Sequence, residues 1–299
     1  MTSALEGKVI AITGAARGIG AELARQSARR GARVALLGME GARLAAIAAQ
    51  LGDRHVWAEC DVTDQRALAD AFDRVRATLG GIDIVVANGG IASRGPVATS
   101  PIEAQVRVVE VNLIGVMRTV HVALPHLVSS RGYILLISSA AAFAAAPGMA
   151  PYAASKAGVE QFGNVLRTEA ASLGVAVGVA HPSWVDTDLV RDAQRDMPSF
   201  ASALRQLPGP LGRVTDVEGC VAVLVDGIER RARRIYVPAS LRWLAFARSV
   251  FVTEWAERLA ARTGARHSEG AEREARATGR DFGETSVGFG HRNHVNEKP

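Results

Sequence analysis

The sequence contains few of the residues on which disulfide-bonded or metal-centred proteins depend. Cys60 and Cys220 are the only cysteines among 299 residues, too few and too far apart for a disulfide framework or a zinc site. The seven histidines show no metal-ligand spacing, so no metal site is predicted. Low cysteine content fits a reducing compartment, and the N-terminus lacks a basic segment followed by an apolar stretch and a cleavage site. We therefore expect a cytoplasmic protein.

Long apolar runs, strong net charge and lysine are also scarce. No apolar run approaches the ~20 residues that a membrane-spanning helix needs, so no transmembrane segment is predicted. The formal net charge of +5 is mild and gives no argument for a nucleic-acid partner. The chain carries 35 Lys and Arg residues, yet its only lysines are Lys8, Lys156 and Lys298. Each lysine position is therefore informative.

Short branched apolar runs alternate with longer segments of helical period, and glycines stand where most of the helices should end. Buried strands are expected at Val9–Thr13, Arg33–Leu37, His55–Cys60, Ile82–Ala87, Tyr133–Ser138, Val175–His181 and Arg234–Val237. Helices are expected at Ile19–Arg30, Ala42–Leu51, Gln65–Leu79, Glu103–Leu124, Tyr152–Leu173 and Val217–Ile228. This alternation predicts an α/β fold, a doubly wound Rossmann-type parallel sheet of about seven strands with helices on both faces.

The C-terminal part of the sequence departs from this pattern. Leu241–Ala261 reads as an amphipathic helix that packs on its own domain or on a second subunit. Contact of this helix with a membrane surface is possible but not favoured. Residues 262–299 mix charges with glycine and show almost no apolar periodicity, which predicts a disordered tail. We thus expect a single Rossmann-type domain over residues 1–261.

A glycine-rich segment, Thr13-Gly14-Ala15-Ala16-Arg17-Gly18-Ile19-Gly20, lies between the first strand and the first helix. Glycines there allow unusual backbone angles, let a pyrophosphate approach the chain and leave helix N–H groups aimed at the anion. Its placement at the first strand-to-helix junction predicts dinucleotide binding, although three residues separate the first two glycines, unlike the commonest fingerprint.

From this motif onward the chain resembles the short-chain dehydrogenase/reductase family of the Tyr-x-x-x-Lys type, over roughly residues 5–240. Thr13–Gly20 matches the family's T-G-x-x-x-G-x-G without gaps. Further features follow in the family's order: Asp61-Val62, Asn88-Gly89-Gly90 with Gly89 in place of alanine, Asn112, Ser138-Ser139, Tyr152-Ala-Ala-Ser-Lys156, and Pro182-Ser183-Trp184-Val185-Asp186-Thr187 with Ser183 in place of glycine.

The pair Tyr152 and Lys156 also carries an argument of its own. Four residues apart on a helix, the two side chains lie on one face. A phenol with a pKa near ~10 is a poor base at neutral pH, and an adjacent ammonium favours the phenolate. The alternative is an ordinary surface pair, but a chain that uses arginine almost everywhere else places one of its few lysines here. The pattern therefore predicts a catalytic acid/base.

The resemblance implies a role for each site residue. Tyr152 would exchange the proton with the substrate oxygen, and Ser139 would polarise that oxygen, with Ser138 as the competing candidate on the opposite side of the strand. Lys156 would bind the nicotinamide ribose, and Asn112 would hold a relay water unless it bonds only local backbone. Trp184 is expected at the substrate with Ser139 and Tyr152. The residues implied in cofactor binding are Gly14, Arg17, Gly18, Ile19, Gly20, Asp61, Val62, Asn88, Gly89, Gly90, Tyr152, Lys156, Pro182, Val185 and Thr187.

The choice between the two nicotinamide cofactors depends on the end of the second strand. NAD-specific members of the family usually carry an aspartate there, and this chain has Gly38, so no carboxylate blocks a 2′-phosphate. Arg17 could pair with that phosphate. Against this, Met39 stands where many NADP-using members place a basic residue, and Glu40 could act as a displaced acid. The pattern favours NADP over NAD.

The substrate is a small molecule whose class the sequence only suggests. Apolar residues of Leu189–Leu211, with Phe143, Met149 and Trp184, could form a lid for a lipophilic alcohol or ketone, although a lid helix packs in the same way. The predicted function is reversible hydride transfer to a carbonyl or from a secondary alcohol. Alternatives are 3-oxoacyl-carrier reduction and a non-catalytic nucleotide-binding protein.

The resemblance implies a homo-oligomer, either dimer or tetramer, formed through the helices Glu103–Leu124 and Tyr152–Leu173.

Overall fold

A computed structural model describes residues 3–93, 95–143, 148–196, 198–206, 212 and 214–248 of the chain. The strands are β1 Val9–Thr13, β2 Arg33–Gly38, β3 Val56–Glu59, β4 Ile84–Ala87, β5 Tyr133–Ile137, β6 Ala176–Pro182 and β7 Arg234–Val237. The helices are α1 Gly18–Arg29, α2 Gly41–Leu51, α3 Gln65–Leu79, α4 Ile102–Val109, α5 Gly115–Val128, α6 Ala150–Ala171, α7 Asp188–Asp196, α8 Pro198–Gln206, α9 Val217–Glu229 and α10 Leu241–Phe246. Two short turns complete them: a π-helix, η1, at Glu110–Ile114 and a 3₁₀ turn, η2, at Ala140–Ala142.

All seven strands pair in parallel in the order β3-β2-β1-β4-β5-β6-β7. The order reverses between β1 and β4, and in open parallel sheets ligands bind outside the carboxyl ends of the strands at such a point. The predicted doubly wound fold is confirmed, and the expected strand ends are wrong by no more than two residues.

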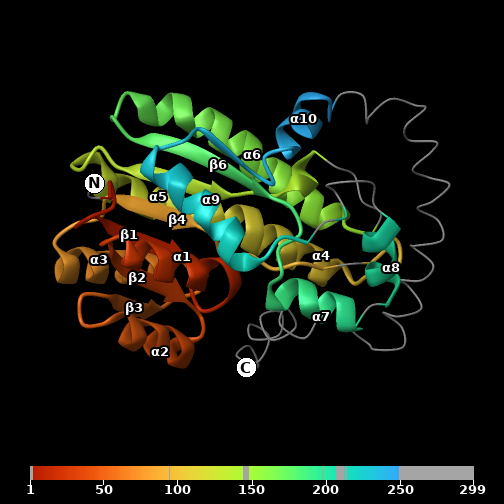
Figure 1. Ribbon diagram of the computed structural model, residues 1–299, viewed down its shortest axis with the longest axis horizontal. Helices are drawn as coiled ribbons and strands as arrows, with labels where there is room; N and C mark the ends of the chain where they lie inside the picture. The colour runs from red at the N-terminus through yellow and green to blue at the C-terminus, as the bar shows by residue number, and fades with distance from the viewer. Residues whose placement is uncertain are drawn as a thin grey trace, which may run out of the picture.

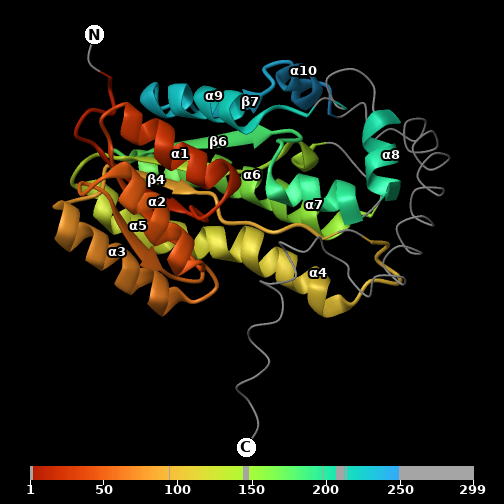
Figure 2. The same cartoon turned by 60° about the horizontal axis from the view of Figure 1, so that its bottom comes forward.

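Alternating side chains of the strands build two apolar layers, one on each face of the sheet. Ile10 and Ile12 of β1 pack with α1, α2 and α9, whereas Val9 and Ala11 pack with α3, α5 and α6. Figure 2 shows α1 and α9 on one side of the sheet and α5 on the other. Because both faces are covered, the strands read as continuous apolar runs.

The stretch expected as one helix at Glu103–Leu124 is longer in the structure and is interrupted. It begins at Ile102, contains the π-helix η1 and ends at Val128. By length and composition alone Ile102–Val128 is apolar enough to cross a membrane, with half of its most apolar window buried in the fold. A core helix meets the same criteria, so this finding alone does not indicate a membrane protein.

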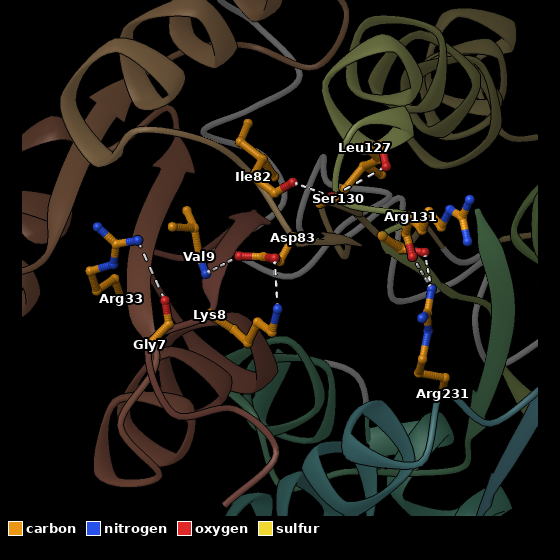
Figure 3. A network of polar contacts seen from close by, with 11 residues as sticks. Gly7, Lys8, Val9, Arg33, Ile82, Asp83, Leu127, Ser130, Arg131 and Arg231 are labelled. Carbon is orange, nitrogen blue, oxygen red and sulfur yellow. Dashed lines mark hydrogen bonds and ion pairs between the residues drawn. The ribbon is translucent and has the colours of Figure 1, made fainter. Parts of the chain in front are cut away.

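Polar contacts at the amino ends of the strands join the loops there (Figure 3). Asp83 accepts hydrogen bonds from Lys8 Nζ at 3.0 Å and from the Val9 amide at 2.9 Å. Arg231 donates to the backbone carbonyls of Arg131 and Gly132. These contacts tie β1, β4, β5 and the turn before β7 together at the edge opposite the carboxyl ends.

The C-terminal predictions lie mostly outside the described residues. Of the expected helix Leu241–Ala261, the structure describes Leu241–Phe246 as α10, which packs on Phe143 and Ala140 through buried Leu241. The segment expected as a lid at Leu189–Leu211 contains two helices, α7 and α8 (Figure 1).

Candidate active site

The turn between β1 and α1 is built so that backbone rather than side chains faces its concave side. Gly14 has φ +65° and Gly18 has φ +50°, a left-handed region that favours glycine. A Cβ on Gly20 would lie 2.2 Å from the Gly14 carbonyl oxygen, so only glycine fits there. Arg17 takes the N-cap position of α1 without a side-chain cap. The first-turn N–H groups of α1 therefore suit a phosphate anion.

The turn after β4 is fixed against this glycine turn. Asn88 Nδ2 donates to the carbonyl oxygens of Thr13 and Gly14 at 3.0 and 3.1 Å. Thr13 Oγ1 accepts the amides of Asn88 and Gly89 at 3.1 and 3.2 Å. Asn88 thus acts first as a brace of the glycine turn, and the loops at the switch point between β1 and β4 form one unit.

Charged residues flank the turn at the ends of β2 and β3. Arg17 donates through Nε to Glu40 Oε2 at 2.6 Å, and its Nη2 contacts Glu40 Oε1. This hydrogen bond raises the pKa of Arg17 above its ordinary value. Asp61 accepts the Thr63 amide at 2.8 Å and forms an ion pair with Arg107 Nη2 at 3.3 Å. Arg107 was not predicted, because no sequence pattern relates α4 to the end of β3.

The structure brings Ser139, Tyr152 and Lys156 together. Ser139 follows β5, and its Oγ accepts the Ala141 amide at 3.2 Å, close to the Tyr152 phenol near the start of α6. Lys156 Nζ lies 5.7 Å from the centroid of the Tyr152 ring and donates to the Ile137 carbonyl at 3.0 Å. Ser138 points elsewhere, donating to the Lys156 carbonyl at 2.7 Å. Of the two serines, Ser139 is therefore the one beside Tyr152.

Burial dominates the ionisation of this group. It raises the pKa of the Tyr152 phenol, and the neighbouring Ser139 hydroxyl offsets part of this rise. Burial also lowers the pKa of Lys156 to about 8. The Tyr–Lys spacing alone predicted an ammonium that lowers the phenol pKa, but in the protein itself the shift has the opposite direction. Removing water from both groups sets the direction of both shifts, since burial penalises each charged form.

Asn112 lies fully buried in η1 and is bonded to a neighbouring strand loop. Its Oδ1 accepts the Ile91 amide at 2.8 Å, and its Nδ2 donates to the Ile91 carbonyl at 2.9 Å and to Ser155 Oγ at 3.3 Å. A Cβ on Gly90 would lie 3.2 Å from Asn112 Oδ1 and 3.5 Å from Lys156 Nζ. Asn112 therefore sits beside the lysine and holds the chain after Gly90 in place. Ile91 joins these hydrogen bonds through its backbone alone, so no side-chain pattern in the sequence indicates it. Ser155, by contrast, lies within the Tyr-x-x-x-Lys segment of the sequence.

The segment after β6 meets the glycine turn. The Thr187 methyl carbon would lie 3.1 Å from a Cβ on Gly18, so Thr187 reaches the first turn of α1. Val185 bridges to Thr215, and the Ser183 amide donates to the Val237 carbonyl at 2.8 Å. Among the described residues, only Arg131 and Arg231 are non-glycines with positive φ. Ser183 thus adopts an ordinary backbone, and its place in a glycine position causes no strain.

The residues expected in a lid separate into distinct groups. Phe143 and Met149 are buried, and Phe143 packs against His181 and Tyr236 rather than over the site. Leu204 of α8 is buried as well. Met197, Leu207 and Pro208, together with the Phe200 side chain, lie outside the described residues.

Comparison with known proteins agrees with this geometry. Residues 8–198 match the family model described as short chain dehydrogenase. The cis-4-hydroxycyclohexanecarboxylate dehydrogenase of Sinomonas cyclohexanicum is 36% identical over 230 residues, covering 76% of this chain and 92% of that protein. The 3-oxoacyl-[acyl-carrier-protein] reductase of Escherichia coli (strain K12) is 34% identical over 223 residues, covering 74% and 91%. A crystal structure of a short-chain type dehydrogenase/reductase from Mycobacterium marinum superimposes with a TM-score of 0.71 at 28% identity, covering 78% of this chain and 94% of that one.

Proposed function

This chain belongs to the short-chain dehydrogenase family, and from that membership we propose that it catalyses reversible hydride transfer between a nicotinamide cofactor and the carbon of a carbonyl or secondary alcohol. The observation that carries the proposal is the position of the Ser139 hydroxyl beside the Tyr152 phenol, with Lys156 Nζ 5.7 Å from the tyrosine ring. Two neighbouring hydroxyls can both reach one substrate oxygen.

Each side chain then has a defined task. Tyr152 donates its proton to the carbonyl oxygen during reduction and accepts it from the alcohol during oxidation. Ser139 bonds the same oxygen and orients it. Lys156 carries its charge beside the phenol, and Asn112 holds the Ile91 peptide next to that lysine. A raised phenol pKa keeps Tyr152 protonated, as a proton donor requires.

The glycine turn and the open N-terminus of α1 suit the pyrophosphate of a dinucleotide, whose nicotinamide supplies or takes up the hydride when bound. Gly14, Gly18, Ile19 and Gly20 would face the pyrophosphate. Further residues proposed to hold the cofactor are Asp61, Val62, Asn88, Gly89, Gly90, Pro182, Val185 and Thr187. The contact of Thr187 with Gly18 supports a continuous cofactor surface between the two loops.

For the cofactor we propose NADP over NAD. Gly38 leaves the end of β2 without a carboxylate, and Arg17 provides a guanidinium for a 2′-phosphate. That guanidinium is bonded to Glu40, so a bound phosphate must compete with this carboxylate. Turnover of one substrate with both cofactors tests the proposal, and a large preference for NAD contradicts it.

For the substrate we propose a lipophilic ketone or alcohol, with Trp184 among its contacts. One relative is named for the oxidation of a hydroxylated cyclohexane, a cyclic secondary alcohol. Another relative is named for 3-oxoacyl-carrier reduction, which makes a carrier-linked 3-oxoacyl group the second candidate. A panel of cyclic, aromatic and 3-oxoacyl ketones, watched by loss of NADPH absorbance, distinguishes the two. Turnover of small polyols or sugars alone contradicts the lipophilic class.

We also propose a homo-oligomer in the cytoplasm. Ile102 and Val106 on α4 and Val165 on α6 are exposed apolar side chains on the helices through which association is expected. Light scattering of the purified chain tests this proposal, and a monomer at micromolar concentration contradicts it.

A further inference from the structure

His181 lies fully buried near the carboxyl end of β6, within a slot of aromatic rings. Its ring stacks on that of Tyr236 from β7, with centroids 5.1 Å apart and an interplanar angle of 17°. Phe143, which follows η2, covers the ring with a centroid separation of 5.4 Å. The slot is therefore lined by two strands and by the segment that begins at Ser139.

The two ring nitrogens of His181 have unequal surroundings. Nδ1 lies 3.4 Å from the carbonyl oxygen of Ser139. A carbonyl oxygen can only accept, so this contact requires the tautomer in which Nδ1 carries the hydrogen. Nε2 is then a bare acceptor, and it is buried without a hydrogen-bond partner in the described part of the chain. Burial also lowers the pKa of His181 to about 4, so the ring is neutral near pH 7.

A phenylalanine would fill this slot without leaving a buried nitrogen unpaired. A buried polar atom without a partner lowers stability, and its presence in a folded protein calls for another explanation. Within the described part of the chain, the polar contact of this ring is with Ser139, whose hydroxyl lies beside Tyr152.

The neighbourhood of Ser139 shows what this contact can do. The parallel pairing of β5 with β6 ends at Ile137 and Ala180, with one further bond from the Ser138 amide to Ala180. Beyond it the backbone turns away into η2, and the Ser139 carbonyl also accepts the Ala142 amide at 3.1 Å. The His181 side chain is therefore the next link from β6 to this turn.

We propose that His181 is a positioning residue for Ser139: its Nδ1–H holds the Ser139 carbonyl and so sets how the serine hydroxyl faces Tyr152. The role rests on the proposed oxidoreductase function, but the contact itself can be tested without turnover. It predicts opposite effects on stability and on catalysis, which a purely structural side chain does not produce.

The test compares His181→Phe with His181→Gln, which keeps an N–H donor, and with Tyr236→Phe as the matched control in the same slot. His181→Phe should keep or raise Tm, lower kcat about tenfold or more and leave the KM for the dinucleotide unchanged; His181→Gln should restore part of kcat. Tyr236→Phe should keep wild-type kcat. A wild-type kcat in His181→Phe, or a kcat that falls only together with Tm, overturns the proposal.

Two readouts apply even if no substrate is turned over. Nitrogen chemical shifts should report the neutral Nδ1–H tautomer of His181 at pH 7, and His181→Phe should speed amide exchange at Ala141 and Ala142 without lowering Tm. The Nε2–H tautomer, or unchanged exchange in this turn, overturns the positioning role. Failure of Tyr152→Phe to reduce turnover would instead overturn the proposed function and leave these two results standing.

Discussion

The guanidinium of Arg17 and the carboxylate of Glu40 form a two-point contact across the rim of the glycine turn, with Nε 2.6 Å from Oε2. Both side chains are mostly buried, so the contact is stronger than an exposed ion pair. A 2′-phosphate that binds Arg17 must displace Glu40. Under the proposed function, we therefore expect this pair to affect the selectivity between the two nicotinamide cofactors.

Glu40→Gln should shift selectivity toward NADP. Loss of the carboxylate removes a competitor for Arg17 and a charge that repels the phosphate, so the ratio of kcat/KM for NADPH to that for NADH should rise about tenfold, or ~1.4 kcal/mol. Arg43→Gln is the matched control, because Arg43 also contacts Glu40, at 3.3 Å, but leaves the Arg17 contact intact. An unchanged ratio in Glu40→Gln, or an equal rise in the control, would contradict this role.

Gly20→Ala should destabilise the protein and abolish dinucleotide binding. The added Cβ would lie 2.2 Å from the Gly14 carbonyl oxygen, so the turn must open. Overpacking of this kind costs about 1–3 kcal/mol. Gly81→Ala provides the control, because a Cβ there meets no atom within 4 Å. Thermal unfolding and quenching of protein fluorescence by NADPH measure both effects, and equal Tm values for the two variants would refute the close approach.

Asn112→Ala should lower both stability and kcat. It leaves the Ile91 amide and carbonyl without their buried partner, and each such loss costs about 1–3 kcal/mol. Denaturant unfolding should show the loss, and amide exchange at Ile91 should accelerate. Asn112→Asp keeps the acceptor for the Ile91 amide, so its stability should lie between that of wild type and that of Asn112→Ala. Wild-type exchange at Ile91 in the alanine variant would be inconsistent with the observed pairing.

Lys156 predicts a specific dependence of stability on pH. Burial lowers its pKa from 10.5 to about 8 in the folded protein, so between these values the unfolded chain binds more protons than the folded one. Its burial penalty, up to about 3 kcal/mol at 1.36 kcal/mol per pKa unit, is fully present below pH 8 and disappears as the pH rises to about 10.5. The free energy of unfolding of wild type relative to Lys156→Met should therefore rise across that window. If the difference in free energy of unfolding between wild type and Lys156→Met stayed constant or fell across this window, burial would not penalise the charged form of Lys156.

The fold could be predicted from the sequence because the two sequence patterns that indicate it are both local. Short branched runs and the glycines after helices fix the strands and their order along the chain, and right-handed crossovers then determine the sheet. The helix expected from Glu103 to Leu124 includes the residues of η1 as ordinary α-helix, because a π-helix has no distinct apolar period in the sequence.

The residues of the candidate site could be named from the sequence, but their contacts could not. The order of motifs identifies Ser139, Tyr152 and Lys156, and the structure brings them together. The partners of Asn112 and Asp61, by contrast, are a peptide group at Ile91 and a guanidinium at Arg107, and both pairings depend on how loops meet in space. The direction of the Tyr152 pKa shift was also beyond the sequence, because it is set by burial rather than by the four-residue spacing. His181 was expected to be structural, and its contact with Ser139 appears only in the fold.

The central claim, that Tyr152 exchanges the proton with substrate, is tested most directly by Tyr152→Phe. The change removes one oxygen from a partly buried ring, so NADPH binding measured by fluorescence should remain. Ketone reduction at saturating cofactor should fall at least about 100-fold, the contribution expected of a positioned general acid. Turnover by Tyr152→Phe at the wild-type rate would contradict the account.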